Sequence, residues 1–301
     1  MPVAIAREGR IAVVTIDNPP VNALSQALRQ DLLHAVESLD SDGGVDAVVL
    51  ICTGRTFIAG ADVNEFGKPP QPPHLPDVVS RIERAAKPWI AAIHGSALGG
   101  GLEVALGCRF RVAAASASLG LPEVKLGLVP GAGGTVRLPR LVGAAAAVEM
   151  VTGGAPVDAR KAAAMALVDS VVDGDLRSFA VEFANGVAGQ ALPQAIADRA
   201  VAPVADDFWE AAEKTVGARA KREIAPLRAL ACLRKASEAG FDAAMAFERE
   251  TFLELRGSPQ AAALRHVFFA ERAASRPAEL AGIAPRDIRS ERKRQAPAKS
   301  A

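Results

Sequence analysis

The chain has 301 residues, of which 50% are hydrophobic and only 4% aromatic; it contains no tyrosine, and its formal net charge is +1. This length allows one large domain or two modest ones, with a core built mainly from Ala, Val, Leu and Ile. A net charge so close to zero gives no electrostatic case for binding nucleic acid or an acidic partner.

The sequence shows neither a membrane segment nor a signal peptide. No apolar run approaches the ~20 residues that a transmembrane helix needs, and residues 1–8 lack a basic start followed by an apolar stretch. The three cysteines, Cys52, Cys108 and Cys232, are far apart and have no metal-ligand spacing, which is typical of buried, reduced cysteines. We therefore expect a cytoplasmic protein without a metal site or a membrane association.

The N-terminal segment predicts a β-hairpin followed by a helix. Residues 3–7 and 11–17 read as two strands joined by a turn at 8–10. Ser25 is a suitable N-cap for the helix that follows. The apolar positions of this helix recur with the 3.6-residue period of an amphipathic helix; they are Leu28, Leu32, Ala35, Val36 and Leu39.

Continuous apolar runs over 46–53 and 89–93 predict strands that are covered on both faces, hence an α/β layer arrangement. Residues 66–78, between them, contain one glycine and five prolines, which predicts an irregular loop. From about residue 176 the chain becomes alanine-rich and helical. We expect five helices near 176–190, 206–220, 224–238, 240–256 and 259–273.

Three glycine-containing frames suggest a functional site. The first, at 57–63, follows a strand, and its small residues would let a ligand approach main-chain N–H groups. In the second, Gly99, Gly100 and Gly101 lead into an apolar helix that contains Glu103. A helix N-terminus presents free N–H groups and the positive end of its dipole, which suit an oxyanion. Taken singly, each of these two frames is also compatible with an ordinary turn.

The third frame spans 119–135 and places Glu123 between apolar residues and a second glycine cluster. Burial among such neighbours would raise the pKa of Glu103 and of Glu123 and fit them for proton transfer near neutral pH. Two donors and two carboxylates are the groups needed to handle an enolate. By contrast, the sequence has no P-loop, no G-x-G-x-x-G fingerprint and no G-x-S-x-G nucleophile elbow.

In this order and spacing, the three frames resemble the crotonase superfamily, whose archetype is enoyl-CoA hydratase. Residues 119–141 are especially close. The tract 105–113 and the segment 258–272 are most similar to one branch, the hydratase/isomerase half of multifunctional fatty-acid β-oxidation enzymes. The similarity covers roughly residues 3–280.

The resemblance implies a role for each frame. The main-chain N–H groups of Ala61 and Gly100 would hold the thioester oxygen, Glu103 would activate the water that adds to C3, and Glu123 would deliver the proton to C2. The coenzyme A moiety would lie along five residues, Ala59, Gly60, Asp62, Val63 and Asn64. Because coenzyme A is part of the acyl-CoA substrate, no cofactor is expected.

The resemblance also implies an α/β fold, the crotonase-type spiral of ββα units with a helical C-terminal region. We expect the core at 1–190, the helical region at 191–275 and a disordered basic tail at 276–301. In the multifunctional relatives a linker leads into a dehydrogenase domain; here residues 285–289 resemble that linker, but no dinucleotide fingerprint follows. We therefore expect a homotrimer or hexamer, with a separate 3-hydroxyacyl-CoA dehydrogenase as a further partner.

The leading functional hypothesis is hydration of the 2-trans double bond of enoyl-CoA thioesters in fatty-acid β-oxidation. Isomerisation of Δ3 to Δ2 enoyl-CoA is compatible with it, because that reaction needs only one carboxylate and Glu123 is the candidate. A non-catalytic CoA-binding or scaffolding subunit, left from a multifunctional enzyme, is the alternative, and the presence of both glutamates argues against it. Another crotonase-type acyl-CoA reaction remains open as a third reading.

Overall fold

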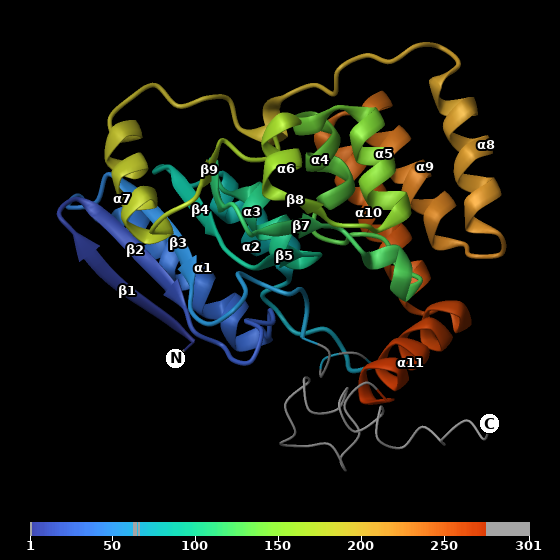
Figure 1. Ribbon diagram of the computed structural model, residues 1–301, viewed down its shortest axis with the longest axis horizontal. Helices are drawn as coiled ribbons and strands as arrows, with labels where there is room; N and C mark the ends of the chain where they lie inside the picture. Colours follow the sequence, from blue (N-terminus) through green and yellow to red (C-terminus); the bar gives the residue numbers. More distant parts are fainter. Residues whose placement is uncertain (1, 63–64, 66, 275–301) are drawn as a thin grey trace, which may run out of the picture.

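The computed structural model describes residues 2–62, 65 and 67–274. It is a mixed α/β structure in which strands and helices alternate over the N-terminal part and helices follow in the C-terminal part (Figure 1). The larger sheet runs in the order β1-β2-β3-β4-β6-β9. Its strands are β1 (Val3–Glu8), β2 (Ile11–Ile16), β3 (Ala47–Cys52), β4 (Trp89–Ile93), β6 (Phe110–Ala114) and β9 (Ser170–Val172).

The predicted hairpin is confirmed, since β1 pairs antiparallel with β2 and Gly9 in the turn has φ +63°. All the other pairs of this sheet are parallel. The helix after the hairpin, α1 (Gln26–Ser41), is also confirmed: the Ser25 hydroxyl accepts a hydrogen bond from the Leu28 amide at 3.3 Å. Its buried residues include the five apolar positions that define the predicted face.

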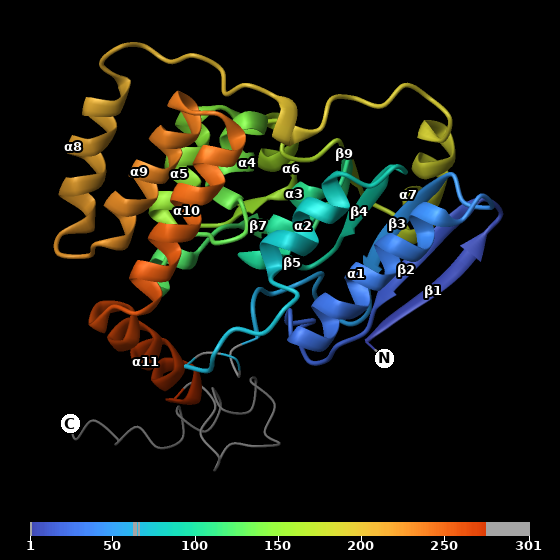
Figure 2. The same ribbon diagram turned by 180° about the vertical axis from the view of Figure 1, so that it is seen from behind.

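The central strands are apolar throughout because the sheet has a core on each face. In β3, Val48 and Leu50 belong to one buried cluster, whereas Ala47 and Val49 belong to the other, as the two-residue period of a strand requires. Helix α7 (Leu176–Val187) covers one face (Figure 1). On the other face lie α1, α2 (Leu75–Glu83) and α3 (Gly100–Gly107), which are in front in Figure 2.

A smaller sheet contains β5 (Ser96–Leu98), β7 (Ser118–Gly120) and β8 (Val157–Asp158), and Ile58 extends it through a parallel bridge to Ala97. Three successive segments of the chain therefore have the same order: each contributes first to the large sheet, then to the small sheet, and then forms a helix. They are β3–Ile58–α2, β4–β5–α3 and β6–β7–α4 (Gly134–Val142). This is the predicted spiral of ββα units.

The five helices expected from residue 176 onward are confirmed as α7 to α11, whereas α5 and α6 were not predicted. After α5 (Ala144–Gly153), α6 (Ala159–Ala164) and α7 come α8 (Phe208–Ala220), α9 (Ala225–Glu238), α10 (Phe241–Arg256) and α11 (Pro259–Ala274). Two short 3₁₀ helices, η2 (Glu123–Leu126) and η3 (Ile196–Asp198), lie between longer elements. Helix α9 packs on α4 and α5, and α10 packs on α9 and α4. The C-terminal helices therefore reach the third ββα unit.

One expectation was wrong. Residues 75–78 are not part of an irregular loop, because α2 begins at Leu75 and carries Pro76 in its first turn. Proline is tolerated there, since the first amides of a helix have no intrahelical acceptor. The predicted boundary at residue 190 stays a prediction, and the predicted disordered tail at 276–301 lies outside the described residues.

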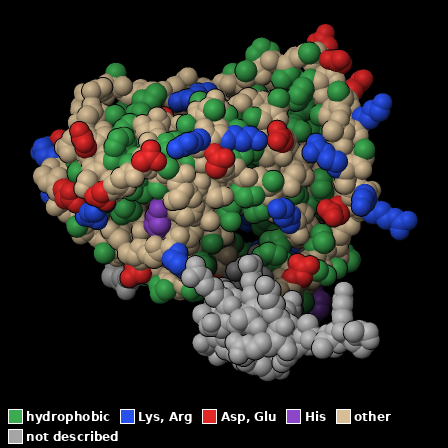
Figure 3. Space-filling view, in the orientation of Figure 1, with side chains coloured by type: hydrophobic (Ala, Val, Ile, Leu, Met, Phe, Trp, Pro, Cys, Tyr) green, Lys and Arg blue, Asp and Glu red, His purple; other side chains and the backbone are tan. Residues whose placement is uncertain are grey.

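The visible surface carries acidic and basic side chains interspersed, without a large area of one sign on the face shown in Figure 3. Within the part of the chain that the structure describes, no helix is both long and apolar enough to cross a membrane. The three cysteines are free and buried, as predicted.

Candidate active site

Glu103 lies in the first turn of α3 and its side chain is only 3% exposed. The turn before it depends on Gly99, which has φ +54° and precedes the helix as its N-cap. One carboxylate oxygen, Oε1, accepts hydrogen bonds from the amides of Ala132 (2.7 Å) and Gly134 (2.9 Å). The third glycine frame thus binds the carboxylate of the second frame, although Ala132 and Glu103 are 29 residues apart in the sequence.

Glu123 is the first residue of η2 and is separated from the end of β7 by Leu121 and Pro122. Its carboxylate packs against Gly99, where a Cβ atom would lie 3.0 Å from Oε1 of Glu123. The other oxygen, Oε2, is buried and has no hydrogen-bond partner among the described residues. This oxygen is therefore available to a reacting group.

The environments of the two carboxylates differ in a way that separates their acidities. Burial raises the pKa of both. For Glu103 this rise is opposed by the amides of Ala132 and Gly134 and by the positive charge of Arg137. For Glu123 the negative charge of Glu103 adds to the effect of burial and raises the pKa well above its ordinary value. Hence Glu103 ionises first while Glu123 retains its proton, the combination of a base and an acid.

The two predicted oxyanion donors lie side by side. The bridge between Ile58 and Ala97 brings the first glycine frame against β5, just before Gly100. A Cβ atom added at Gly100 would lie 3.9 Å from the Ala61 nitrogen. Within the described part of the chain, neither of these two amides donates a hydrogen bond to another residue. Two unpaired N–H groups at one place suit a carbonyl oxygen that gains negative charge.

The predicted substrate-binding segment is placed in part. Ala59 and Ala61 are exposed, Gly60 is buried with φ +117°, and Asp62 is half-buried. The Gly60 carbonyl accepts a hydrogen bond from the Leu24 amide at 2.9 Å, which ties the segment to the residue before Ser25, the N-cap of α1. Val63 and Asn64 lie outside the described residues, and the contacts of all five with coenzyme A stay a prediction.

A third buried carboxylate escaped the sequence-based reasoning. Glu248 of α10 is 1% exposed and accepts hydrogen bonds from the amides of Gly133 (2.6 Å) and Thr135 (2.8 Å) and from the Thr135 hydroxyl (2.6 Å). A signal was present in the sequence, because this glutamate shares one helix face with apolar or small residues. The buried positions of α10 are Ala244, Glu248, Thr251 and Leu255.

Arg137 and Glu83 form a buried ion pair beside this loop. The guanidinium of Arg137 is inaccessible and donates to Glu83 Oε2 at 2.8 and 3.0 Å and to the Ala132 carbonyl at 3.0 Å. Because each charge has a partner and further hydrogen bonds, the pair satisfies the conditions for burying ions. It also holds a positive charge close to Glu103.

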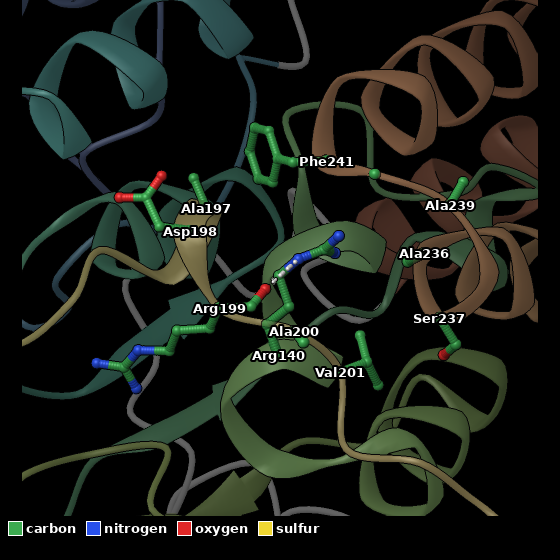
Figure 4. A pocket seen from close by; sticks show the side chains of 11 residues that line it. Arg140, Ala197, Asp198, Arg199, Ala200, Val201, Ala236, Ser237, Ala239 and Phe241 are labelled. Atoms are coloured by element: carbon green, nitrogen blue, oxygen red, sulfur yellow. Dashed lines mark hydrogen bonds between the residues drawn. The ribbon is translucent and has the colours of Figure 1, made fainter.

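A cavity of about 320 Å³ lies elsewhere, between η3 and the connection from α9 to α10 (Figure 4). Arg140 is at its centre; its Nε donates to the Arg199 carbonyl at 3.1 Å and its guanidinium stacks over Phe241 at 5.4 Å. Neither Glu103 nor Glu123 lines this cavity. Over the described residues, no group of three or more His, Cys, Asp and Glu side chains could hold a metal ion.

Residues 6–215 match the family model of the enoyl-CoA hydratase/isomerases. The chain belongs to the enoyl-CoA hydratase/isomerase family. Among solved structures, the enoyl-CoA hydratase/isomerase from Pseudoalteromonas atlantica is similar, with a TM-score of 0.69 and 26% identity; the match covers 90% of this chain and 98% of that one. The fold and the family expected from the three glycine frames are thereby confirmed.

Two curated relatives of this enoyl-CoA hydratase/isomerase family member differ in length. The peroxisomal bifunctional enzyme of Danio rerio is 40% identical over 269 residues, which cover 88% of this chain but 37% of the relative. The probable enoyl-CoA hydratase of Bacillus subtilis is 44% identical over 173 residues, 55% of this chain and 67% of that protein. The chain thus spans little more than a third of the bifunctional relative.

Proposed function

We propose that this protein is an enoyl-CoA hydratase, which adds water across the 2-trans double bond of enoyl-CoA thioesters in fatty-acid β-oxidation. The observation that carries the proposal is the difference between its two buried carboxylates. Two amides and a nearby arginine stabilise Glu103 as an anion. The pKa of Glu123 is raised, and one of its carboxylate oxygens has no hydrogen-bond partner among the described residues. Hydration of a conjugated thioester requires a base and an acid at one place.

In the proposed reaction, Glu103 removes a proton from a water molecule as the water oxygen forms its bond to C3. The C2–C3 π electrons move toward the thioester carbonyl, whose oxygen becomes an enolate oxygen. The amides of Ala61 and Gly100 donate hydrogen bonds to that oxygen, where preorganised donors lower the barrier most. Glu123 then transfers its proton to C2, and the product is a 3-hydroxyacyl-CoA.

The same site can support isomerisation of Δ3 to Δ2 enoyl-CoA, because that reaction moves one proton between C2 and C4 through the same enolate. Glu123 is the candidate for the shuttle; its ionised form would take the proton from C2 and return it to C4, and its Oε2 has no partner among the described residues. The family model and the Pseudoalteromonas atlantica structure both carry isomerase in their names, which favours this second activity. A scaffolding role is disfavoured, because a non-catalytic protein has no use for paired carboxylates whose burial is costly.

The proposal extends to the surroundings of the enzyme. The substrate supplies coenzyme A, so we propose that no separate cofactor takes part. We place the protein in the cytoplasm as a homotrimer or hexamer and propose that a separate 3-hydroxyacyl-CoA dehydrogenase consumes its product. The Danio rerio relative is named a bifunctional enzyme, which is consistent with a second activity in that protein.

Loss of the ultraviolet absorbance of crotonyl-CoA on adding the purified chain tests the proposal. We expect turnover at a rate typical of enzymes, ~1–10³ per second. The double variant Glu103→Gln/Glu123→Gln serves as the inactive control, because it keeps the shape of both side chains. Tight binding of crotonyl-CoA without any loss of absorbance would show a scaffold instead.

A further inference from the structure

Four consecutive amides form an alternating arrangement in the loop that leads into α4. The amides of Ala132 and Gly134 donate to Glu103, whereas those of Gly133 and Thr135 donate to Glu248. The two acceptors come from different helices, Glu103 from α3 and Glu248 from α10, so two helices hold the loop. The orientation of each pair of N–H groups therefore depends on the other, because neighbouring peptide planes share a Cα atom.

The packing around this loop leaves little freedom for another conformation. A Cβ atom at Gly133, which has φ +96°, would collide with the Arg137 guanidinium. At Gly134, a Cβ atom would lie 2.6 Å from Pro130 Cβ and 3.0 Å from Glu103 Oε1. The loop is therefore fixed by close contacts and by hydrogen bonds at every amide from 132 to 135.

We propose that Glu248 is a positioning residue for catalysis: by binding the amides of Gly133 and Thr135, it keeps the alternate amides of Ala132 and Gly134 directed at Glu103. This inference rests on the proposed function. Glu248 acts through the loop and not on the substrate. Without it, the loop can rotate, Glu103 loses one or both of its amide donors, and its carboxylate is no longer held as an oriented base.

The charge of Glu248 provides a readout that a purely structural role would not change. The titratable groups that interact with it are Glu103 on α3, Glu123 on η2 and Cys232 on α9, while Arg137 on α4 acts on Glu103. Burial and the charge of Glu103 raise the pKa of Glu248, while its three donors oppose the rise. The negative charge of Glu248 in turn raises the pKa of Glu123. Removing that charge should therefore make Glu123 a stronger acid.

The decisive variant is Glu248→Gln, which keeps the size of the side chain but turns an NH₂ group toward one of the loop amides. We expect kcat for crotonyl-CoA hydration to fall about 10-fold or more, with KM changed less than about 3-fold, since the substrate does not touch this residue. The alkaline limb of the kcat profile, where Glu123 loses its proton, should move to lower pH by about half a unit or more. The matched control is Glu250→Gln on the exposed face of the same helix, which should match wild type.

Titration of the carboxyl carbons by ¹³C NMR separates this inference from the proposed function, because it requires no turnover. In Glu248→Gln, the apparent pKa of Glu123 should fall and amide exchange should accelerate at Ala132 and Gly134. If wild type hydrates nothing yet these changes appear, the proposed reaction fails and the positioning role stands. If kcat, the Glu123 titration and the exchange rates all equal those of wild type, Glu248 has no positioning role.

Should Glu248→Gln fail to fold, substitutions at Thr135 test the same contact more gently. Thr135→Val removes the hydroxyl donor to Glu248 Oε2 and keeps the amide, whereas Thr135→Ser keeps both. We expect Thr135→Val to lower kcat several-fold and Thr135→Ser to restore most of it. Equal kcat for wild type, Thr135→Val and Thr135→Ser would overturn the proposal.

Discussion

At the scale of single residues, the candidate site depends on placing two carboxylates in unlike surroundings. Both are buried, but Glu103 has two amide donors on one oxygen, and Glu123 has a buried oxygen without a partner among the described residues. Donors stabilise the anion and burial alone stabilises the acid. The same residue type is therefore suited to opposite tasks within one candidate site.

The first prediction concerns these two side chains. Glu103→Gln and Glu123→Gln should each lower the hydration kcat by at least ~10²-fold, the usual contribution of a positioned acid or base. Isomerase activity should survive the loss of Glu103 better than the loss of Glu123, because isomerisation needs one proton shuttle. Steady-state kinetics with crotonyl-CoA and with a 3-enoyl-CoA measure both effects. Near-native hydration by either variant would rule out the two-carboxylate mechanism.

The second prediction concerns the oxyanion donors. In Gly100→Val, the new side chain would meet Leu75 Cδ2 and Leu24 Cδ1, at 2.8 and 3.0 Å from its Cβ, and would occupy the space beside the Ala61 amide. We expect the rate to fall by ~10²–10³-fold, as when an oxyanion donor is lost. The residue with positive φ is Gly99, not Gly100, so the backbone itself should tolerate the change. Thermal unfolding checks this, and a normally folded, fully active variant would exclude Gly100 as a donor.

At the scale of elements, the N-termini of α3 and α4 both carry glycines because close approach leaves no room for side chains. At Gly101 a Cβ atom would collide with the Ile58 carbonyl, which ties α3 to the bridge of the first ββα unit. The loop before α4 is packed just as closely, and its Gly133 also has a left-handed backbone conformation. Both helix starts are thereby fixed next to the carboxylates.

The third prediction tests this closeness. Gly133→Ala should lower the free energy of unfolding by at least ~1–2 kcal/mol, since alanine is strained at a left-handed position and would also displace Arg137. The control is Gly217→Ala in the last turn of α8, where a Cβ atom meets nothing within 4 Å. That change should raise stability by ~1 kcal/mol through helix propensity. Urea unfolding measures both, and equal stabilities for the two variants would contradict the argument.

At the scale of the whole molecule, three buried carboxylates with raised pKa values make stability depend on pH. A group whose pKa is higher in the folded state binds its proton more tightly there, so its contribution is complete below the unfolded pKa and is lost as pH rises through the folded pKa. For Glu248 the window runs from the ordinary value of 4.5 to about 8. Glu103 and Glu123 act in the same direction.

The fourth prediction is therefore a fall in the free energy of unfolding between pH 5 and pH 8. The slope should be smaller in Glu248→Gln, because glutamine does not titrate. Urea unfolding at pH 5, 6, 7 and 8 gives the slope for each protein. A stability that is constant or rises over this range in wild type would show that these carboxylates ionise as they do in the unfolded chain.

The fifth prediction is self-association. Large apolar side chains that are at least one third exposed gather on or next to the C-terminal helices; in the described part of the chain they include Leu227, Leu253, Val267 and Phe269. Apolar surface of this kind favours an interface between subunits. Light scattering at micromolar concentration should give the mass of a trimer or hexamer, and Leu253→Glu with Val267→Glu should lower it. A monomeric wild type would contradict this expectation.

The sequence by itself determined the N-terminal hairpin, the two central strands, α1, α3, the five later helices and the identity of the two catalytic candidates. The 3.6-residue period of apolar positions predicted α1, and alanine-rich composition interrupted by proline and glycine predicted the five later helices. The family resemblance of the glycine frames pointed to Glu103 and Glu123 before their surroundings were known. The start of α2 was missed because proline fits either a loop or a first helical turn.

Only the tertiary structure decided which residues support that pair. Glu248 lies 113 positions from Thr135 in sequence, and the ion pair of Arg137 with Glu83 spans 54. A local sequence pattern does not predict which group will pair with a buried charge, because the pairing depends on how the C-terminal helices pack on the third ββα unit. For the same reason, the difference in acidity between Glu103 and Glu123 follows from donors and charges that folding brings to them.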